Sequence, residues 1–282
     1  MKGKIFILLL ILISLDACKQ QEKSADVKIV FLHHSTGRIL WTGINTSKIE
    51  KLFRRVNEKL AQGQLPGLFS KYNKEQNKNY SIEEITFPKN YPYGWNNFPY
   101  DYYNIWVKNA GNEPYLEEPT LEMLTKKYDV IIFKHCYPVS NIQPEQDNGD
   151  IQSETKTISN YKLQYNALRK KMNEFPDTKF ILFTGAVQVQ SKINEDEAKR
   201  AREFFQWVKA EWDLEGDNIY LWDLYSLQTE GGIYFKDEYA VSVNDSHPNE
   251  EFAGSVAELL FNRIVDIIES DGNKTKLTGD QE

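Results

Sequence analysis

The sequence predicts an α/β protein in which a doubly wound, mainly parallel five-stranded sheet carries helices on both faces. Two observations support this fold class: five short runs rich in β-branched and aromatic residues, and helix-period segments between them. The runs are VKIVFL at 27–32, IEEITF at 82–87, VIIF at 130–133, FILF at 180–183 and IYLWDL at 219–224. Apolar runs without alternation are typical of strands buried on both faces, and strand–helix alternation is typical of a parallel sheet. The second run contains two glutamates and is the weakest of the five strand predictions.

Four segments between or beyond these runs have the apolar spacing of amphipathic helices. The first opens with a capping box, Ser47-x-x-Glu50, and ends at Gly63. We expect the others at about 159–174, 195–213 and 250–269, where large apolar residues recur every three or four positions. The polar stretch 270–282 is expected to be a frayed tail.

The composition narrows the class of protein. The chain has 282 residues, with 34 lysines and arginines against 41 aspartates and glutamates, and a net charge of −7. This balance argues against a general nucleic-acid binder, which needs a basic face. Two cysteines are too few for a disulfide scaffold or a Cys-rich zinc site. A hydrophobic fraction of 40% suffices for a sizeable core, so we expect an ordinary acidic globular domain.

The N-terminus has the pattern of an export signal. Lys2 and Lys4 precede an unbroken apolar run at 5–13, which is too short for a membrane span of about 20 residues. Residues 15–18, Leu-Asp-Ala-Cys, resemble the lipobox of bacterial lipoproteins, although the aspartate departs from the usual small or apolar residue. The alternative is a buried N-terminal strand, which the flanking lysines and Cys18 disfavour.

These features divide the chain into four parts. We expect a lipoprotein signal peptide at 1–17, the lipidated Cys18 with a polar tether at 18–26, a globular domain at 27–269 and the polar tail at 270–282. The resemblance implies an exported protein of the bacterial cell envelope that meets the membrane only through its lipid anchor. The oligomeric state does not follow from the sequence.

A serine follows the first predicted strand, in the segment His33-His34-Ser35-Thr36-Gly37. Ligands bind at the carboxyl ends of the strands in doubly wound sheets, and a serine at such a corner exposes its hydroxyl. The alternative is a structural role for the serine in a Ser/Thr turn or as a helix N-cap. The two histidines could also suggest a metal, but adjacent strand residues point to opposite faces and no acidic or histidine cluster completes a ligand set, so we expect no metal.

A histidine lies near the other end of the domain, in Asn-Asp-Ser-His-Pro-Asn at 244–249. Pro248 restricts the backbone and Asn249 is a good N-cap, so we expect His247 on a rigid loop at the start of the last helix. An imidazole held there can act as the general base for a serine hydroxyl, with a carboxylate to orient it. Taken alone, an exposed histidine in a capping loop is the simpler interpretation.

The pairing of an early serine with this late motif resembles the SGNH/GDSL hydrolase superfamily over about 27–269. The family's Gly-Asp-Ser start is replaced here by His33-His34-Ser35, and Asn244 occupies the place of its aspartate in DxxHPN. The resemblance implies a flavodoxin-like, doubly wound fold and a serine hydrolase that acts on ester bonds without a cofactor.

The same resemblance implies roles for individual residues. Ser35 is expected to be the nucleophile and His247 the base, oriented by Asp245. Asp223, at the end of the fifth strand, is an alternative to Asp245, and so is a Ser–His dyad without a carboxylate. The expected oxyanion hole consists of the Ser35 amide, Gly94 and Asn141, because the family's Gly-x-Asn-Asp is absent after the third strand and Asn141 is the nearest amide.

Residues 91–106, YPYGWNNFPYDYYNIW, contain eight aromatic side chains in sixteen positions. Proline, glycine and asparagine interrupt the run, so we expect a loop whose rings cannot all be buried. Tyr93 and Trp95 are therefore predicted to contact substrate, with His34 and Cys136 also lining the site. A catalytic thiol at Cys136 beside His135 is the alternative, and we favour a bystander role.

These observations together predict a serine esterase that removes O-acetyl groups from a glycan. The expected partner is an ester-bearing small molecule or glycan, and no nucleic acid is expected. Two alternatives stay open: a glycan-binding or scaffolding lipoprotein of the same fold without activity, and a lipase or other acyl-ester hydrolase, which would differ in its acyl pocket.

Overall fold

The computed structural model describes residues 25–43, 63–146 and 148–281, and it contains one five-stranded parallel sheet in the order β2-β1-β3-β4-β5. The strands are β1 (Val27–His33), β2 (Tyr80–Thr86), β3 (Val130–Phe133), β4 (Lys179–Phe183) and β5 (Ile219–Trp222). This order and the helices on both faces confirm the predicted doubly wound α/β class. The chain changes direction across the sheet at β1, which has β2 on one side and β3 on the other, so ligands are expected at the carboxyl end of β1.

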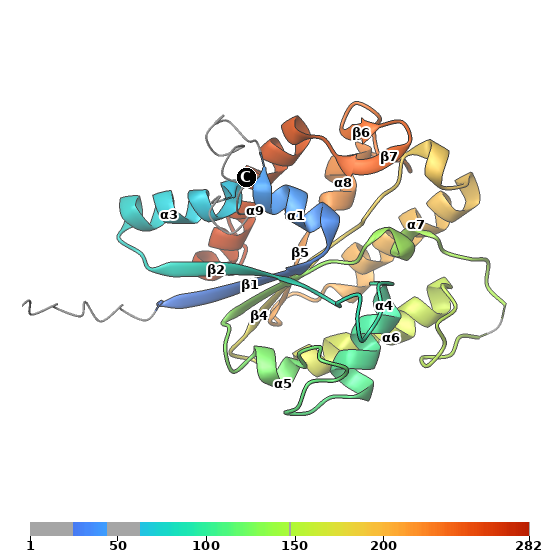
Figure 1. Cartoon of the computed structure of the whole chain (residues 1–282), viewed down its shortest axis with the longest axis horizontal. Helices are drawn as coiled ribbons and strands as arrows, with labels where there is room; N and C mark the ends of the chain where they lie inside the picture. Colours follow the sequence, from blue (N-terminus) through green and yellow to red (C-terminus); the bar gives the residue numbers. More distant parts are fainter. Residues whose placement is uncertain (1–24, 44–62, 147, 282) are drawn as a thin grey trace, which may run out of the picture.

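Helices cover the sheet on two sides, as Figure 1 shows for α1, α3 and α9 on one side and α4, α5 and α6 on the other. The first set comprises α1 (Ser35–Thr42), α3 (Gln64–Gln76) and α9 (Glu250–Ser270). The second comprises α4 (Pro99–Tyr103), α5 (Leu121–Leu124) and α6 (Ile158–Met172), with α7 (Glu195–Trp207) packed on α6. A short helix, α8 (Leu224–Thr229), follows β5, and β6 (Ala240–Ser242) pairs antiparallel with β7 (Asp245–Pro248).

Four predicted strands match closely in position, and the fifth is shorter than predicted. The run 219–224 ends as a strand at Trp222, because the Asp223 side chain accepts the Ser226 N–H and begins α8. Residues 29–33 of β1 are all buried, as an apolar run in a central parallel strand requires. The edge strand β2 buries only Tyr80 fully, which explains its weaker sequence signal.

The aromatic run 91–106 is only partly the loop that the sequence predicted. Pro99 opens α4, and Asp101 accepts the Phe98 N–H at 2.8 Å, so the second half of the run is helical. A π-helical turn (Asn104–Lys108) extends it. Five of the eight rings are buried in the core, namely Phe98, Tyr100, Tyr102, Tyr103 and Trp106. Only the first half of the run, before the helix, presents strongly exposed rings.

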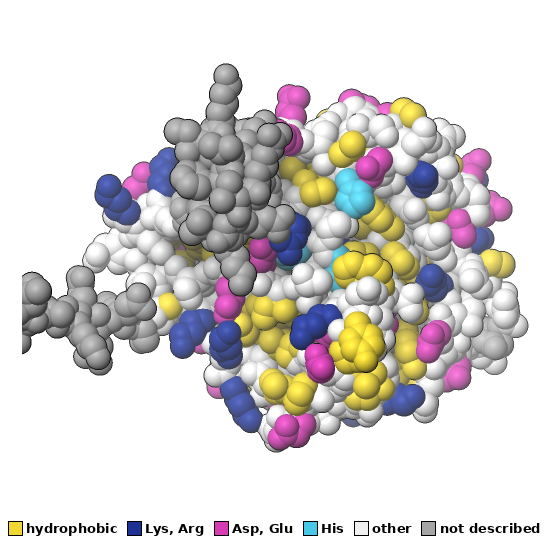
Figure 2. Space-filling model, viewed as in Figure 1, with side chains coloured by type: hydrophobic (Ala, Val, Ile, Leu, Met, Phe, Trp, Pro, Cys, Tyr) yellow, Lys and Arg dark blue, Asp and Glu magenta, His cyan; other side chains and the backbone are white. Residues whose placement is uncertain are grey.

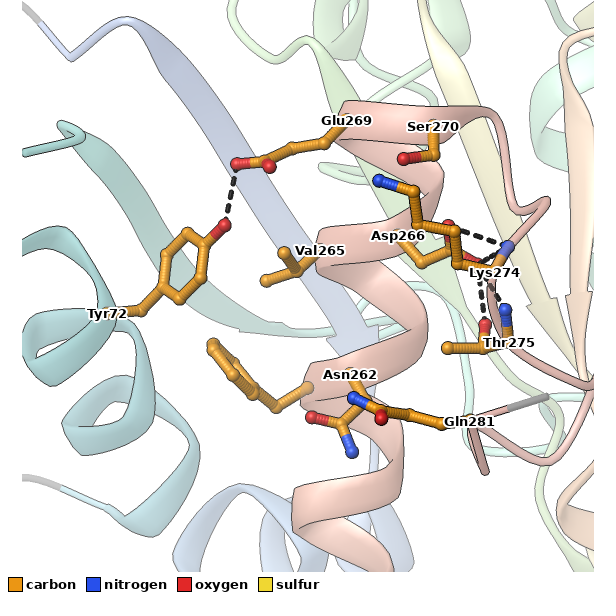
Figure 3. Close-up of a pocket in the computed structure, with 10 residues that line it drawn as sticks. Tyr72, Asn262, Val265, Asp266, Glu269, Ser270, Lys274, Thr275 and Gln281 are labelled. Atoms are coloured by element: carbon orange, nitrogen blue, oxygen red, sulfur yellow. Dashed lines mark hydrogen bonds between the residues drawn. The ribbon is translucent and has the colours of Figure 1, made fainter. Parts of the chain in front are cut away.

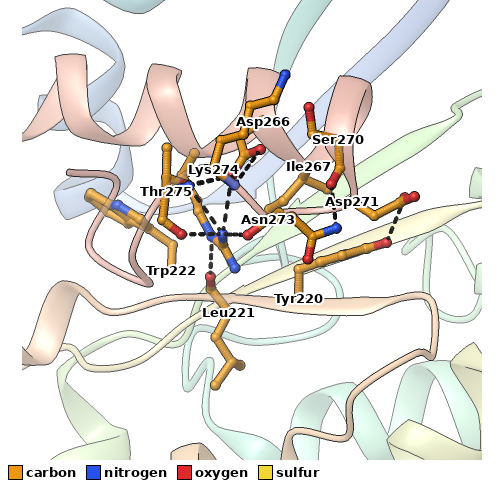
Figure 4. A network of polar contacts seen from close by, with 12 residues as sticks. Tyr220, Leu221, Trp222, Asp266, Ile267, Ser270, Asp271, Asn273, Lys274 and Thr275 are labelled. Atoms are coloured by element: carbon orange, nitrogen blue, oxygen red, sulfur yellow. Dashed lines mark hydrogen bonds and ion pairs between the residues drawn. The ribbon is translucent and has the colours of Figure 1, made fainter. Parts of the chain in front are cut away.

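The expectation of a frayed tail is wrong. Arg263 of α9 donates to the carbonyl oxygens of Leu221, Gly272 and Thr275, and Asp266 accepts the N–H groups of Lys274 and Thr275, as Figure 4 shows in part. Further on, Trp222 Nε1 donates to Thr278 O at 2.9 Å. The tail therefore packs beside β5, because its backbone satisfies hydrogen-bonding groups of two buried charged side chains of α9 that their mutual ion pair leaves open.

A pocket of about 580 Å³ lies between α3, α9 and this tail. Figure 3 shows Tyr72 of α3 facing Val265 and Glu269 of α9 across it, with the tyrosine hydroxyl donating to Glu269 at 2.8 Å. Its lining includes neither Ser35 nor His247.

Several predictions fall outside the described residues. These are the signal peptide at 1–17, the lipidated Cys18, all but the last two residues of the tether at 18–26, and the helix that begins at Ser47. Within the described parts of the chain, no helix is long and apolar enough to cross a membrane.

Candidate active site

Ser35 is the first residue of α1, directly after the last residues of β1, and it is exposed. His34 occupies the N-cap position, so Ser35 is neither the N-cap nor part of a simple turn. These were the two non-catalytic alternatives for this serine. Gly37 allows this close connection, because a Cβ there would lie 2.3 Å from the Cβ of His33. The sharp passage from β1 into α1 thus presents the hydroxyl at the carboxyl edge of the sheet.

His247 comes from the other end of the chain and lies on β7 rather than on the predicted loop. The short hairpin with β6 holds this segment, and Asn249 caps α9 by accepting the Phe252 N–H, as predicted. The Ser246 hydroxyl accepts the Val189 N–H at 3.1 Å, which ties the strand to the segment after β4. A hairpin and a helix cap therefore position the imidazole.

The structure brings Ser35, His247 and Asp245 into one hydrogen-bonded chain. His247 Nε2 lies 2.8 Å from Ser35 Oγ, and His247 Nδ1 lies 2.7 Å from Asp245 Oδ1. The ionised carboxylate can only accept, so Nδ1 carries the proton and donates it to Asp245. In the neutral imidazole this leaves Nε2 as an acceptor for the serine O–H. This tautomer is the one that a general base for a serine requires.

Asp245 is well suited to hold the imidazole. Its Oδ1 also accepts the His247 backbone N–H at 3.0 Å, and this bond, with the side-chain bond, lowers the pKa of the carboxyl group below its usual value. Asp223, the alternative partner, is buried and forms a separate set of bonds to Thr184, Lys209 and Ser226 instead of a bond to His247. The geometry therefore favours Asp245 over Asp223.

Tyr137 links the two halves of the site and was missed from the sequence. Its hydroxyl donates to Ser246 O at 2.5 Å and accepts from Thr36 Oγ1 at 3.1 Å. Its ring meets the His247 ring edge-on, with centroids 5.4 Å apart. The only sequence signal was an aromatic residue just after the third strand, where polar groups gather.

Of the three predicted oxyanion-hole residues, Ser35 has an available N–H, whereas Gly94 and Asn141 bind other groups. The Ser35 N–H lies in the first turn of α1, where helical N–H groups have no intrahelical acceptor. The Gly94 N–H instead donates to Lys89 O at 3.1 Å, within its own loop. Asn141 Oδ1 accepts from Gln188 Nε2 at 2.6 Å, so the side chain of this residue is bound to the segment after β4. The helix N-terminus is thus the best-placed donor in the described residues.

Two of the predicted substrate-contacting residues lie together. The Trp95 ring is 55% exposed and lies 4.3 Å from the ring of buried His34, measured between centroids. His34 Nε2 contacts Pro88 O, and burial lowers the pKa of His34 to about 4, so this imidazole is neutral. Figure 2 shows histidine side chains at the surface beside hydrophobic ones on the face viewed.

Tyr93 faces another direction. Its hydroxyl accepts from Asn104 Nδ2 at 3.2 Å, and its ring contacts Tyr115, so its visible contacts are structural. Cys136 is half-buried and its N–H donates to Asn97 O at 2.9 Å. Asn97 itself is buried, has a positive φ of 49° and donates from Nδ2 to Phe87 O. This asparagine, which the sequence reasoning did not select, joins the aromatic run to the end of β3.

The described residues contain no group of three or more histidine, cysteine, aspartate or glutamate side chains arranged to hold a metal ion. His33 Nε2 lies 3.0 Å from Glu84 Oε2 on the neighbouring strand β2. The chemistry that the described groups can perform is removal of a proton from Ser35 by His247, with Asp245 stabilising the imidazolium that forms.

No protein-family model matches the chain, and no curated protein sequence matches it. Among solved structures, it is similar to a variant of Axe2, an acetyl xylan esterase from Geobacillus stearothermophilus, with 15% identity and a TM-score of 0.47, over 83% of this chain and 92% of the other. It is also similar to a gut microbial diltiazem-metabolizing enzyme, with 13% identity and a TM-score of 0.44 over 83% of this chain and 45% of the other. A third similar structure is a family two carbohydrate esterase from Cellvibrio japonicus, with 10% identity and a TM-score of 0.43 over 87% of this chain and 62% of the other. At these scores the likeness carries no assignment of activity, which must come from the site.

Proposed function

We propose that this protein is a serine hydrolase that cleaves ester bonds, with O-acetyl groups on a glycan as the substrate class. The observation that carries the proposal is the chain from Ser35 Oγ through His247 to Asp245, with both bonds shorter than 3 Å. The three residues come from opposite ends of the domain, so their alignment does not follow from local chain geometry. Such an alignment activates a hydroxyl that is otherwise a weak nucleophile.

In the proposed reaction, Ser35 Oγ attacks the ester carbonyl carbon while His247 Nε2 takes its proton. The imidazolium that forms is stabilised by Asp245, which stays ionised because its pKa is lowered. The oxygen that becomes negative in the tetrahedral intermediate is expected to accept the Ser35 N–H at the start of α1, where the helix dipole also favours negative charge. His247 then returns the proton to the leaving alcohol, and water releases the acyl group by the same steps.

A fluorophosphonate probe tests this assignment, because it labels an activated serine without knowledge of the substrate. Wild-type protein should be labelled at Ser35, Ser35→Ala should not be labelled, and His247→Ala should react at least about 100-fold more slowly. Ser255→Ala is a matched control, because Ser255 donates only to Phe252 O within α9 and should leave labelling unchanged. Labelling that persists in Ser35→Ala, or a folded wild type that is never labelled, contradicts the proposal; the latter result favours an inactive binding protein.

The preference for a glycan is supported by the exposed rings before α4. Trp95 lies against His34, one residue before Ser35, and Tyr91 on the same loop is 83% exposed. Flat, exposed rings beside a polar site are suited to stacking on sugars. A lipase would instead need an apolar acyl pocket next to the serine. Release of acetate from an acetylated oligosaccharide, against no release of long-chain acid from a matched ester, distinguishes the two.

We also propose that the chain is exported and anchored through a lipid on Cys18, from the pattern of its first 18 residues. Cells that express the full chain should incorporate labelled palmitate into it, and Cys18→Ser should abolish this incorporation and release the protein from membranes. Palmitate labelling that is unchanged in Cys18→Ser would reject the anchor. This test is independent of any hydrolase activity.

A further inference from the structure

Lys134 and Cys136 form an unusual pair at the carboxyl end of β3. Lys134 is fully buried, with an exposed fraction of 0%, and its Nζ lies 3.8 Å from Cys136 Sγ. Residues two apart in an extended segment point to the same side, which explains how the amine meets the thiol. Among the described residues, Nζ has no other hydrogen-bond or ion-pair partner. No part of the proposed ester hydrolysis uses this contact.

A lysine in this position faces a large desolvation cost. Burial lowers the pKa of Lys134, because the charged form is no longer solvated, and this favours the neutral amine. The Cys136 thiol is its hydrogen-bond partner. At 3.8 Å the Lys134 amine is placed to accept the thiol proton as the sulfur reacts, which gives an ammonium beside a thiolate. The ammonium–thiolate form makes the sulfur nucleophilic.

The accessibility of Cys136 and the groups next to it limit which reactions its sulfur can undergo. Cys136 is half-buried rather than sealed in the core, so a small oxidant can reach it. It is the only free cysteine in the described parts of the chain, so those parts offer no second thiol for a disulfide. The amine of Lys134 is a nucleophile in direct contact with this sulfur.

We propose that Cys136 is a modification site for hydrogen peroxide, and that Lys134 captures the oxidised sulfur in a covalent sulfur–nitrogen bond. In the first step the thiolate attacks one peroxide oxygen; the O–O bond breaks, and sulfenic acid and hydroxide result. In the second, the Lys134 ammonium gives a proton to that hydroxide, which forms water. In the third, the Lys134 amine attacks sulfur and displaces the sulfenic oxygen as water. Overall, the thiolate, the ammonium and one peroxide yield a sulfenamide and two waters.

The second step follows from the same electrostatics as the pairing. Once the thiolate has become a neutral sulfenic acid, the buried ammonium has lost its counter-charge. Burial then favours the neutral amine, which is the nucleophilic form. Oxidation thus activates the group that completes the linkage. The inference does not depend on the proposed esterase activity.

Mass spectrometry of the full chain after brief treatment with hydrogen peroxide tests the linkage. The peptide that contains residues 129–141 has no methionine, so its mass reports on Cys136. Wild type should lose two hydrogen atoms in this peptide, and dithiothreitol should restore the original mass. A peptide that gains only oxygen, or that stays unmodified while the half-buried Met123 is oxidised, overturns the proposal.

Three variants sharpen the result. Lys134→Met should yield a sulfenic acid that dimedone traps, with no loss of hydrogen, and should be oxidised about tenfold more slowly. Cys136→Ser should show no change in this peptide. Lys209→Met is the matched control, because that lysine is bound to Asp223 and should leave the wild-type mass loss intact. Loss of two hydrogens in Lys134→Met would show that another group captures the sulfur. If Lys134→Met fails to fold, fragmentation of the wild-type peptide still decides whether the linkage joins 134 to 136.

Discussion

The Arg263 cluster and the Ser35 site both gather polar side chains beside the sheet, but they differ in how those groups are paired. Arg263 and Asp266, 4% and 6% exposed, lie 3.6 Å apart and share their remaining bonds among carbonyl and N–H groups of the tail. At the carboxyl end of β3, the strand that pairs with β1, the buried Lys134 contacts only a thiol, and both ring nitrogens of buried His135 lack a hydrogen-bond partner among the described residues. The first arrangement uses buried polarity for stability, and the second keeps groups reactive.

The largest effect on stability is expected in the Arg263 cluster. Arg263→Met removes the donor to three carbonyl oxygens and leaves Asp266 without its cation, so the free energy of unfolding should fall by about 3–5 kcal/mol. Urea denaturation measures this loss. Ser35→Ala is the counterpart, since Ser35 is exposed, and its unfolding free energy should stay within about 0.5 kcal/mol of wild type. The comparison fails if the two variants are equally stable.

The carboxylates Asp245 and Asp223 should separate catalysis from stability. Asp245→Asn should slow fluorophosphonate labelling of Ser35 by roughly 10²–10⁴-fold, because the imidazole loses the partner that sets its tautomer. Asp223→Asn should leave the labelling rate unchanged, while the unfolding free energy falls by about 1–3 kcal/mol with the bonds to Lys209 and Thr184 weakened. The reverse pattern would assign the orienting role to Asp223.

The buried Asp101 in α4, within the aromatic run 91–106, should make the stability of the protein depend on pH. It forms no ion pair with any described residue, and burial raises its pKa to about 6. A raised carboxyl pKa means that the folded state binds the proton more tightly than the unfolded state does. Proton binding at Asp101 therefore stabilises the fold below about pH 4, and this contribution is lost as the pH rises through 6. The unfolding free energy of Asp101→Asn, taken relative to that of wild type, should therefore rise by up to about 3 kcal/mol from pH 4 to pH 7. Denaturation curves that shift in parallel at both pH values would contradict this.

The smallest expected effect concerns substrate stacking. Trp95→Ala should raise KM for an acetylated oligosaccharide about tenfold, with little change in kcat and no change for a small aryl acetate. The exposed Leu214, on the loop before β5, provides the control variant Leu214→Ala. An equal loss on both esters would show that Trp95 supports the fold of the site rather than the sugar.

Much of the fold could be predicted because its signals are local. A central parallel strand such as β3 needs a continuous apolar run, and an amphipathic helix such as α9 needs apolar residues at helical spacing; both patterns are visible in the chain. The serine and histidine could be selected because polar residues after buried strands collect at one edge of the sheet. The tail could not, since its polar residues resemble those of a frayed end until Arg263 and Asp266 are seen facing them.

The sequence by itself determined the fold class, the position of Ser35 after the first strand and that of His247 before the last helix. The tertiary structure decided which carboxylate meets His247, that the Gly94 amide is used within its own loop, and that Lys134 is buried against Cys136. The reason is physical. Periodicity records which face of an element is buried, whereas hydrogen-bond partners far apart in the chain depend on distances of a few tenths of an ångström that only the packed domain sets.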